Sequence, residues 1–262
     1  MSLATPEIQR FDAPSHWRAI DFISDLHLDA SHPKTFEAWR RALLDTAADA
    51  VFLLGDVFEA WVGDDARFDD GFERQAAQVL RDAAARRTVA FMAGNRDFLL
   101  GDALLSECDV MRLSDPTLLA AWGQAVLLTH GDALCLADTD YLRFRAMVRS
   151  PAWQQAFLAR SLVERRAVAR QLRDASEANK ATQSPADWAD VDASAAVAWL
   201  QAAGARQLVH GHTHQPGSST LAPGYERHVL SDWDLEASRP RAEVLRLTRA
   251  GFARLSPEQA LA

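Results

Sequence analysis

The sequence predicts an α/β fold in which strands alternate with helices. Five short apolar runs with β-branched or aromatic members are typical of buried strands, at residues 19–24, 50–54, 88–93, 125–129 and 207–209. Apolar residues at helical spacing separate the early runs, over residues 35–47 and 71–86. Because strands that alternate with helices form crossover units, we expect a mixed or largely parallel sheet.

Two later segments do not follow this alternation. Residues 141–192 form a long, mainly helical stretch that Pro151 and Pro185 interrupt. From Tyr225 onward, the runs at 228–230 and 243–247 predict antiparallel strands that close a second sheet. We therefore expect an N-terminal extension (1–18), a core (19–138 and 193–262) and a helical cap inserted between its parts (139–192).

The composition indicates a soluble globular protein. Of 262 residues, 48% are hydrophobic and 24% are charged, and the formal net charge of −8 excludes a nucleic-acid-binding surface that covers the whole protein. Two cysteines do not make a disulfide framework. The first 17 residues lack the apolar segment of a signal peptide, and no run approaches the roughly 20 apolar residues of a membrane span. We expect a cytoplasmic protein.

Each of the five predicted strands ends in a cluster of polar residues. In sheets of this kind, ligands bind beyond the carboxyl ends of the strands. The clusters contain carboxylate, amide and imidazole side chains, which suit Mn, Fe, Zn or Co better than a thiolate site does. The candidate ligands are Asp25, His27, Asp56, Asn95, His130, His212 and His214.

Seven candidate ligands are too many for one ion and fit two ions that share a carboxylate. Two ions about 3.5–4 Å apart can stabilise an in-line phosphoryl displacement and activate water. The sequence has no P-loop, no GxSxG and no GxGxxG. A lone DxH or GD has little weight, because Asp and Gly are ordinary turn residues. Five such clusters in order, each at a strand end, favour a functional site over chance.

The motifs DxH, GDxxE, GNRD, HGD and GHTH, in this order, resemble those of the calcineurin-like metallophosphoesterase family. The longer strings SDLHL (24–28), LGDVFEAWVGDD (54–65) and GNRDFLLG (94–101) resemble the members that cleave a UDP-linked diacylglucosamine in lipid A biosynthesis. The resemblance covers residues 20–247. It implies a four-layer α/β/β/α sandwich with a helical cap.

The resemblance also implies a chemistry and a cofactor. Water would attack the α-phosphorus of the UDP-diacylglucosamine lipid, giving UMP and a diacylglucosamine 1-phosphate. Two divalent metal ions, expected to be Mn²⁺, would be bound with Asp56 as the bridge. The first would be held by Asp25, His27, Asp56 and His214, and the second by Asp56, Asn95, His130 and His212. The implied location is the cytoplasmic face of the inner membrane.

Arg96 follows the candidate ligand Asn95 and carries a distinct hypothesis. A guanidinium cannot act as an acid, but a phosphate leaving group with a second pKa of about 6 can depart without a proton. Arg96 would then place a fixed positive charge on the phosphoryl oxygens. The alternative is that Arg96 only pairs with Asp97 or Asp102.

The predicted cap is strongly basic and also apolar. Residues 143–173 contain eight arginines and one acid, Glu164, with apolar residues interleaved at helical spacing. Such a segment can lie on an anionic membrane or shelter an anionic amphiphile; alternatively, it packs on the core with solvated arginines. The resemblance places substrate contacts at Asn95, Arg96, Asp138, Tyr141, Ser176, Lys180 and His212. Gln183 stands where the family usually has a further lysine.

The leading hypothesis is therefore a dimetal hydrolase that acts on a UDP-linked diacylglucosamine at a membrane surface, with Asp56, Asn95, Arg96, His130 and His212 as catalytic residues. One alternative is a hydrolase of a soluble nucleotide diphosphate or phosphodiester, for which an apolar cap has no use. The other is a non-catalytic scaffold that binds a membrane or a partner, which has no need of seven ligands and Arg96.

Overall fold

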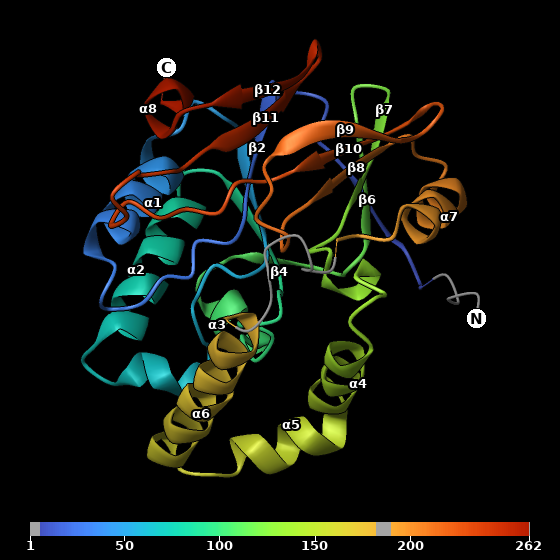
Figure 1. Cartoon of the computed structure of the whole chain (residues 1–262). Coiled ribbons are helices and arrows are strands. Elements are labelled where there is room, and N and C mark those ends of the chain that lie inside the picture. The colour runs from blue at the N-terminus through green and yellow to red at the C-terminus, as the bar shows by residue number, and fades with distance from the viewer. Residues whose placement is uncertain (1–5, 182–189, 262) are drawn as a thin grey trace.

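The computed structural model describes residues 6–181 and 190–261, and the side chains of residues 176–181 are outside this description. Two six-stranded sheets form its centre (Figure 1). The first has the order β12-β11-β2-β3-β4-β5 and the second the order β1-β6-β7-β8-β10-β9. The strands of the first are β2 (Ala19–Ile23), β3 (Ala50–Leu54), β4 (Thr88–Met92), β5 (Met111–Leu113), β11 (Val244–Thr248) and β12 (Gly251–Leu255). Those of the second are β1 (Gln9–Asp12), β6 (Thr117–Ala121), β7 (Gln124–Leu128), β8 (Gln207–His210), β9 (Gly217–Ala222) and β10 (Tyr225–Val229).

The predicted strands and helices are present and lie in four layers. β2 to β5 are parallel to one another, and every residue of β2 and β3 is buried, as expected for strands covered on both faces. Helices cover the outer face of each sheet (Figure 1). They are α1 (Pro33–Asp45), α2 (Phe72–Ala84) and α3 (Asp102–Glu107) on the first sheet, and α7 (Ala193–Ala203) on the second. The α/β/β/α arrangement is confirmed.

Three apolar clusters fill the spaces between these layers. Trp39 and Phe58 belong to the cluster under α1 and α2, and Trp199 belongs to the cluster under α7. The cluster between the sheets contains Phe22 and Phe52, whose rings meet edge to face at 5.7 Å. Because the strands are buried on both sides, their positions at the site are rigidly fixed.

The expectation for the C-terminal strands is wrong in one respect. The runs at 228–230 and 243–247 do not close one second sheet. β10 belongs to the second sheet, where it is parallel to β8 and antiparallel to β9. β11 is antiparallel to β2 and extends the first sheet. Both sheets have apolar faces to extend, so the strand pattern alone does not decide which one a late strand joins.

The segment before residue 19 contributes a strand that the sequence did not predict. β1 pairs in parallel with β6 at the edge of the second sheet. Trp17 is buried with the apolar residues between the sheets, and its carbonyl oxygen accepts a hydrogen bond from Trp122 Nε1 at 2.8 Å. This part of residues 1–18 therefore packs against the sandwich.

Three further helices lie below the sheets in Figure 1. They are α4 (Thr139–Val148), α5 (Pro151–Leu158) and α6 (Leu162–Ala181), in the segment predicted to be mainly helical. Asp138 starts α4 by accepting a hydrogen bond from the Tyr141 amide at 2.9 Å. A short helix, α8 (Pro257–Ala260), ends the described chain, and 3₁₀ turns occur at Asp64–Phe68 and Asp132–Leu134. No helix in the described ranges is both long enough and apolar enough to serve as a membrane span.

Candidate metal centre

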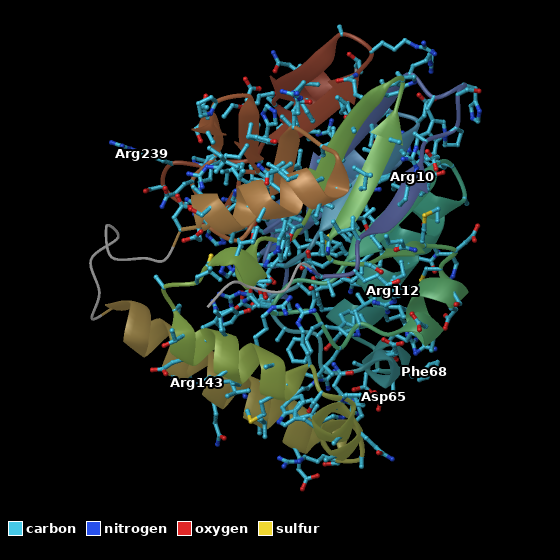
Figure 2. All side chains as sticks on the ribbon, turned by 90° about the vertical axis from the view of Figure 1, so that its right-hand side faces the viewer. Arg10, Asp65, Phe68, Arg112, Arg143 and Arg239 are labelled. Atoms are coloured by element: carbon cyan, nitrogen blue, oxygen red, sulfur yellow. The ribbon has the colours of Figure 1, made fainter. Side chains whose placement is uncertain are left out.

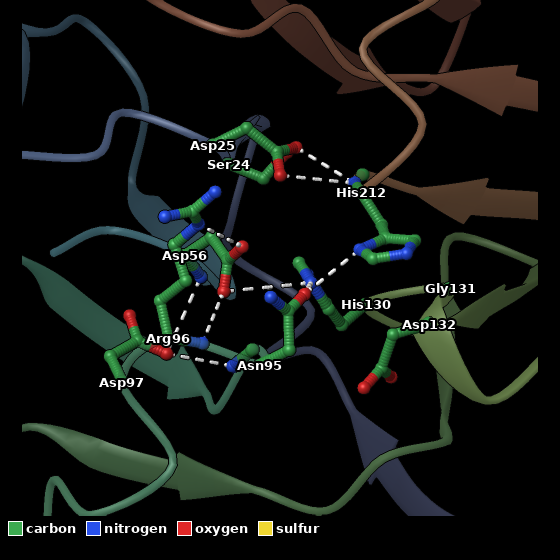
Figure 3. Close-up of polar contacts among 12 residues, drawn as sticks. Ser24, Asp25, Asp56, Asn95, Arg96, Asp97, His130, Gly131, Asp132 and His212 are labelled. Carbon is green, nitrogen blue, oxygen red and sulfur yellow. Dashed lines mark hydrogen bonds and ion pairs between the residues drawn. The ribbon is translucent and has the colours of Figure 1, made fainter. Parts of the chain in front are cut away.

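The candidate ligands converge where β2, β3 and β4 of one sheet and β7 and β8 of the other end together (Figure 3). Two sets of donors form there, and within each set the donor atoms lie within 4.8 Å of one another. The first set is Asp25, His27 and His214, and the second is Asp56, His130 and His212. These sets match the two ion sites expected from the sequence, except that Asp56 appears in the second set alone. The proposed bridging role of Asp56 stays a prediction.

Contacts inside the first set are close. His27 Nε2 lies 3.2 Å from His214 Nε2, and His214 Nε2 lies 3.5 Å from Asp25 Oδ1. The Asp25 carboxylate also accepts hydrogen bonds from the His212 backbone N–H, at 3.0 and 2.9 Å, and from Ser24 Oγ at 2.5 Å. These bonds fix the carboxylate and connect the end of β2 to the end of β8.

The side-chain oxygen of Asn95 lies beside the second set. Asn95 Oδ1 lies 3.0 Å from His130 Nε2 and 2.8 Å from His212 Nδ1, while His130 Nε2 lies 3.6 Å from Asp56 Oδ1. His130 Nδ1 is 2.9 Å from the Leu54 carbonyl oxygen, to which it donates. In the neutral imidazole, Nε2 then carries a lone pair that faces the oxygens of Asn95 and Asp56 (Figure 3). Three acceptors facing one another are what a cation requires.

Charge at the site also favours a cation. Burial raises the pKa of Asp97, and the neighbouring Asp56 carboxylate raises it further, to about 7. Burial by itself would lower the pKa of His130, but the carboxylates of Asp56, Asp132 and Asp25 raise it to about 9. The His130 shift reflects the negative charge of the surrounding carboxylates, which favours a bound proton or another cation. The donors present therefore fit divalent metal ions.

The backbone at the ligands is unusual. Asp25, His27, Asp56, His212 and His214 have φ values of 54°, 48°, 52°, 67° and 51°, in the left-handed region. They are five of the seven such non-glycine residues in the described part of the chain. This conformation costs roughly 1–2 kcal/mol per residue and tends to occur at functional sites. The left-handed turn directs each side chain from its strand end into the site.

Two glycines allow the ligand loops to approach closely. A Cβ atom at Gly94 would overlap the Asp56 carboxylate and backbone nitrogen, and one at Gly211 would overlap the Asp25 carboxylate and Ser24. Asp97 completes the junction, since its buried carboxylate accepts hydrogen bonds from the backbone N–H groups of Gly94 at 2.7 Å and Val57 at 2.8 Å. The GDxxE and GNRD loops are thus held together by Asp97.

Arg96 borders this cluster and does not pair with Asp97 or Asp102. Its Nη1 donates to Glu59 Oε1 at 3.0 Å, and its Nε lies 3.5 Å from Asp56 Oδ2. Asp97 is occupied by backbone N–H groups, and Asp102 pairs with Arg112. The alternative in which Arg96 serves only to neutralise Asp97 or Asp102 is therefore wrong. Glu59 was not among the residues predicted from the sequence, although the GDxxE motif contains it.

The substrate contacts predicted after the HGD motif are Asp138, Tyr141, Ser176 and Lys180. The Tyr141 ring stacks on His212 with 6.0 Å between centroids, and its hydroxyl donates to the buried Asp132 carboxylate at 2.5 Å. Asp138 is exposed and caps α4. The side chains of Ser176 and Lys180 and the whole of Gln183 lie outside the described residues. Only Tyr141 of these is placed at the metal cluster by the described contacts.

Most arginines of the basic segment are paired with the rest of the protein. Arg165 is buried and pairs with Asp65, while Arg166 pairs with Asp69 at 3.0 Å and Glu73 at 3.1 Å. Arg145 Nε donates to Asp132 at 2.7 Å, and Arg149 donates to the Gly94 carbonyl at 2.8 Å. The alternative expectation is that the arginines of the cap are solvated. It holds only for a minority of them, such as Arg143, which lies on the outer surface of α4 (Figure 2).

The three helices also carry exposed apolar side chains. Phe157 and Trp153 stack at 4.8 Å and pack with Leu99 and Phe98 of the core. On the outer surface, large apolar side chains are exposed by 42–75% at Met147, Leu158, Val163 and Leu172. These exposed apolar side chains all belong to α4, α5 and α6, the helices of the predicted cap.

Comparisons with known proteins agree with this geometry. The model of the family described as Calcineurin-like phosphoesterase matches residues 19–216. A curated protein of Chromobacterium violaceum named UDP-2,3-diacylglucosamine hydrolase is 45% identical, over 82% of this chain and 90% of its own length. Proteins of the same name from Ralstonia nicotianae (43%, 86% and 88%) and Stenotrophomonas maltophilia (39%, 88% and 96%) are also similar.

Proposed function

Since the chain belongs to the calcineurin-like phosphoesterase family, we propose that it hydrolyses the diphosphate of UDP-2,3-diacylglucosamine. The observation that carries this proposal is the pair of donor sets at the strand ends with Arg96 beside them. The names of the similar curated proteins supply the substrate. The reaction belongs to the biosynthesis of lipid A.

The metal ligands in this proposal follow the two donor sets. Asp25, His27 and His214 would hold one ion, Asn95, His130 and His212 would hold the other, and Asp56 would serve both. When bound, the two ions stabilise charge on the phosphoryl oxygens and lower the pKa of water. We expect Mn²⁺, a metal that carboxylate, amide and imidazole ligands suit.

The residues of the chain orient the diphosphate for attack at the α-phosphorus. The oxygen of one water joins that phosphorus, and the bond from it to the bridging oxygen breaks. The products are UMP and 2,3-diacylglucosamine 1-phosphate, which keeps the bridging oxygen. Arg96 holds the phosphoryl oxygens with a fixed positive charge. Because donor and acceptor are both charged, its hydrogen bonds to these oxygens are stronger than neutral ones. The leaving phosphate departs without a proton from the protein.

The helical segment serves as a cap for the lipid. In this division of the chain, residues 19–138 and 193–262 form the core and residues 139–192 form the cap. In this proposal Asp138 and Tyr141 contact the sugar, and Ser176 and Lys180 supply polar contacts from the cap. The exposed apolar residues of α4 to α6 meet acyl chains at the cytoplasmic face of the inner membrane. The described ion pairs leave Arg160 and Arg170, both exposed, to face anionic lipid headgroups.

The test is product analysis with metal-depleted protein. UDP-2,3-diacylglucosamine in detergent is incubated with and without Mn²⁺, beside a soluble UDP-sugar. We expect UMP and the lipid 1-phosphate only from the lipid substrate and only with Mn²⁺. Cleavage of the soluble compound at a similar rate would contradict the lipid specificity, and product formation in the presence of a chelator would contradict the metal chemistry.

A further inference from the structure

Glu59 lies at the point where the metal centre, Arg96 and the cap meet. It is the last residue of the GDxxE motif, and its side chain is 16% exposed. Arg96 Nη1 donates to Glu59 Oε1 at 3.0 Å, and Arg173 of α6 forms an ion pair with the same carboxylate. Glu59 Oε2 lies 3.6 Å from His27 Nδ1. One carboxylate thus contacts a candidate metal ligand and two arginines.

The backbone holds Glu59 beside the end of β2. The Glu59 N–H donates to the Leu28 carbonyl at 3.0 Å, and Leu28 and Phe58 form an isolated parallel bridge. Leu28 directly follows His27, so the carboxylate and the imidazole are fixed with respect to each other. Glu59 is therefore placed by the same strand-end geometry that places the ligands.

We propose that Glu59 is a positioning residue that orients His27 toward the metal and holds Arg96 at the site, while Arg173 ties it to the cap. This inference rests on the proposed dimetal function. At 3.6 Å the Glu59 carboxylate is too far from His27 Nδ1 for a direct hydrogen bond. Its negative charge beside Nδ1 nevertheless favours the tautomer with the proton on Nδ1, which directs the Nε2 lone pair toward the metal and raises its basicity. His27 Nε2 faces His214 in the first donor set, as this role requires.

A second carboxylate, Asp232, lies near His214 of the same donor set. Asp232 Oδ2 lies 3.8 Å from His214 Nδ1, and Asp232 also pairs with Arg241 at 2.6 Å. Both histidines of the set therefore face a carboxylate that an arginine holds. Arg241 is half exposed, whereas the partners of Glu59 are Arg96 of the site and Arg173 of the cap. Of these two carboxylates, Glu59 is the one that contacts Arg96, the residue proposed to hold the phosphoryl oxygens.

The experiment measures Mn²⁺ binding to the metal-depleted full-length protein by calorimetry, together with steady-state kinetics. For Glu59→Gln we expect a 10–100-fold weaker affinity at one of the two sites, as loss of such a partner typically produces. The other site keeps its affinity, and kcat falls because Arg96 is less well held. Glu107→Gln is the matched control, since Glu107 accepts from Arg67 at 2.7 Å and Arg81 at 2.5 Å away from the site.

A Mn²⁺ isotherm for Glu59→Gln that equals that of the wild type would overturn the proposal. Weakening of both sites, with a lower melting temperature of the metal-free protein than that of Glu107→Gln, would also overturn it, because Glu59 would then be structural. Glu59→Asp retains the charge and should recover part of the lost affinity. If wild-type protein binds two Mn²⁺ ions and the lipid is not hydrolysed, the proposed function fails while the role of Glu59 is still decided by the isotherms.

Discussion

The metal centre and the cap are held to the same sandwich in different ways. Around the metal centre, Asp25, Asp56 and His130 are at most 2% exposed, and backbone N–H groups and carbonyls fix their side chains. The cap reaches the core through one small apolar cluster around Phe157 and through ion pairs, and its outer surface keeps large apolar side chains exposed. The site for chemistry is tightly packed, while the part proposed to meet lipid has fewer buried contacts, so we expect it to open more easily.

The largest expected effect is at the centre of the tightly packed region. Replacing Asp56 with Asn removes the proposed bridging charge and changes little in shape. Since a metal supplies several kcal/mol of transition-state stabilisation, we expect kcat/KM to fall by about 10³-fold or more. Metal analysis by mass spectrometry should show fewer than two ions per chain. Full activity with two ions bound would refute the bridging role.

Arg96→Gln should separate charge from metal binding in the same region. Loss of a positioned donor to a developing charge typically lowers kcat by about 10²–10³-fold. The two Mn²⁺ ions should remain, because the Arg96 side chain is not among the donors. The measurement pairs single-turnover kinetics with metal content. Loss of metal together with activity would make Arg96 a structural residue of the cluster.

The same contrast explains what the sequence could predict. Each ligand lies within a few residues of its strand, so local patterns such as SDLHL and HGHTH identify both the strand and the site. Glu59, in contrast, is informative only because Arg96 and Arg173 reach it from distant segments. Arg165 also pairs with Asp65, a residue far from it in the sequence. Likewise, β11 joins the first sheet through its pairing with the distant strand β2. No local pattern encodes such contacts.

Phe157→Ala should loosen the cap and leave the metal centre intact. The Phe157 ring is 5% exposed and stacks on Trp153, so its loss removes about 1.5–3 kcal/mol of apolar burial. Hydrogen exchange of the α5 amides should become about 10–100-fold faster. Mn²⁺ affinity measured on the same protein should not change. A matching loss of metal affinity would show that cap and metal centre form one cooperative unit, and it would contradict a tightly packed centre beside a more loosely held cap.

Val163→Ser gives the smallest expected effect and tests the exposed side of the cap. Val163 of α6 is 75% exposed, so its replacement should change the free energy of unfolding by less than about 0.5 kcal/mol. If Val163 enters a lipid surface, the loss of its burial weakens binding to vesicles of anionic phospholipid by up to about tenfold. Cosedimentation with such vesicles measures this change. Met111→Ser is the matched control, since Met111 is an exposed apolar residue of β5 outside the cap. Equal vesicle binding by both variants and the wild type would assign the apolar surface of α6 to a contact other than the membrane.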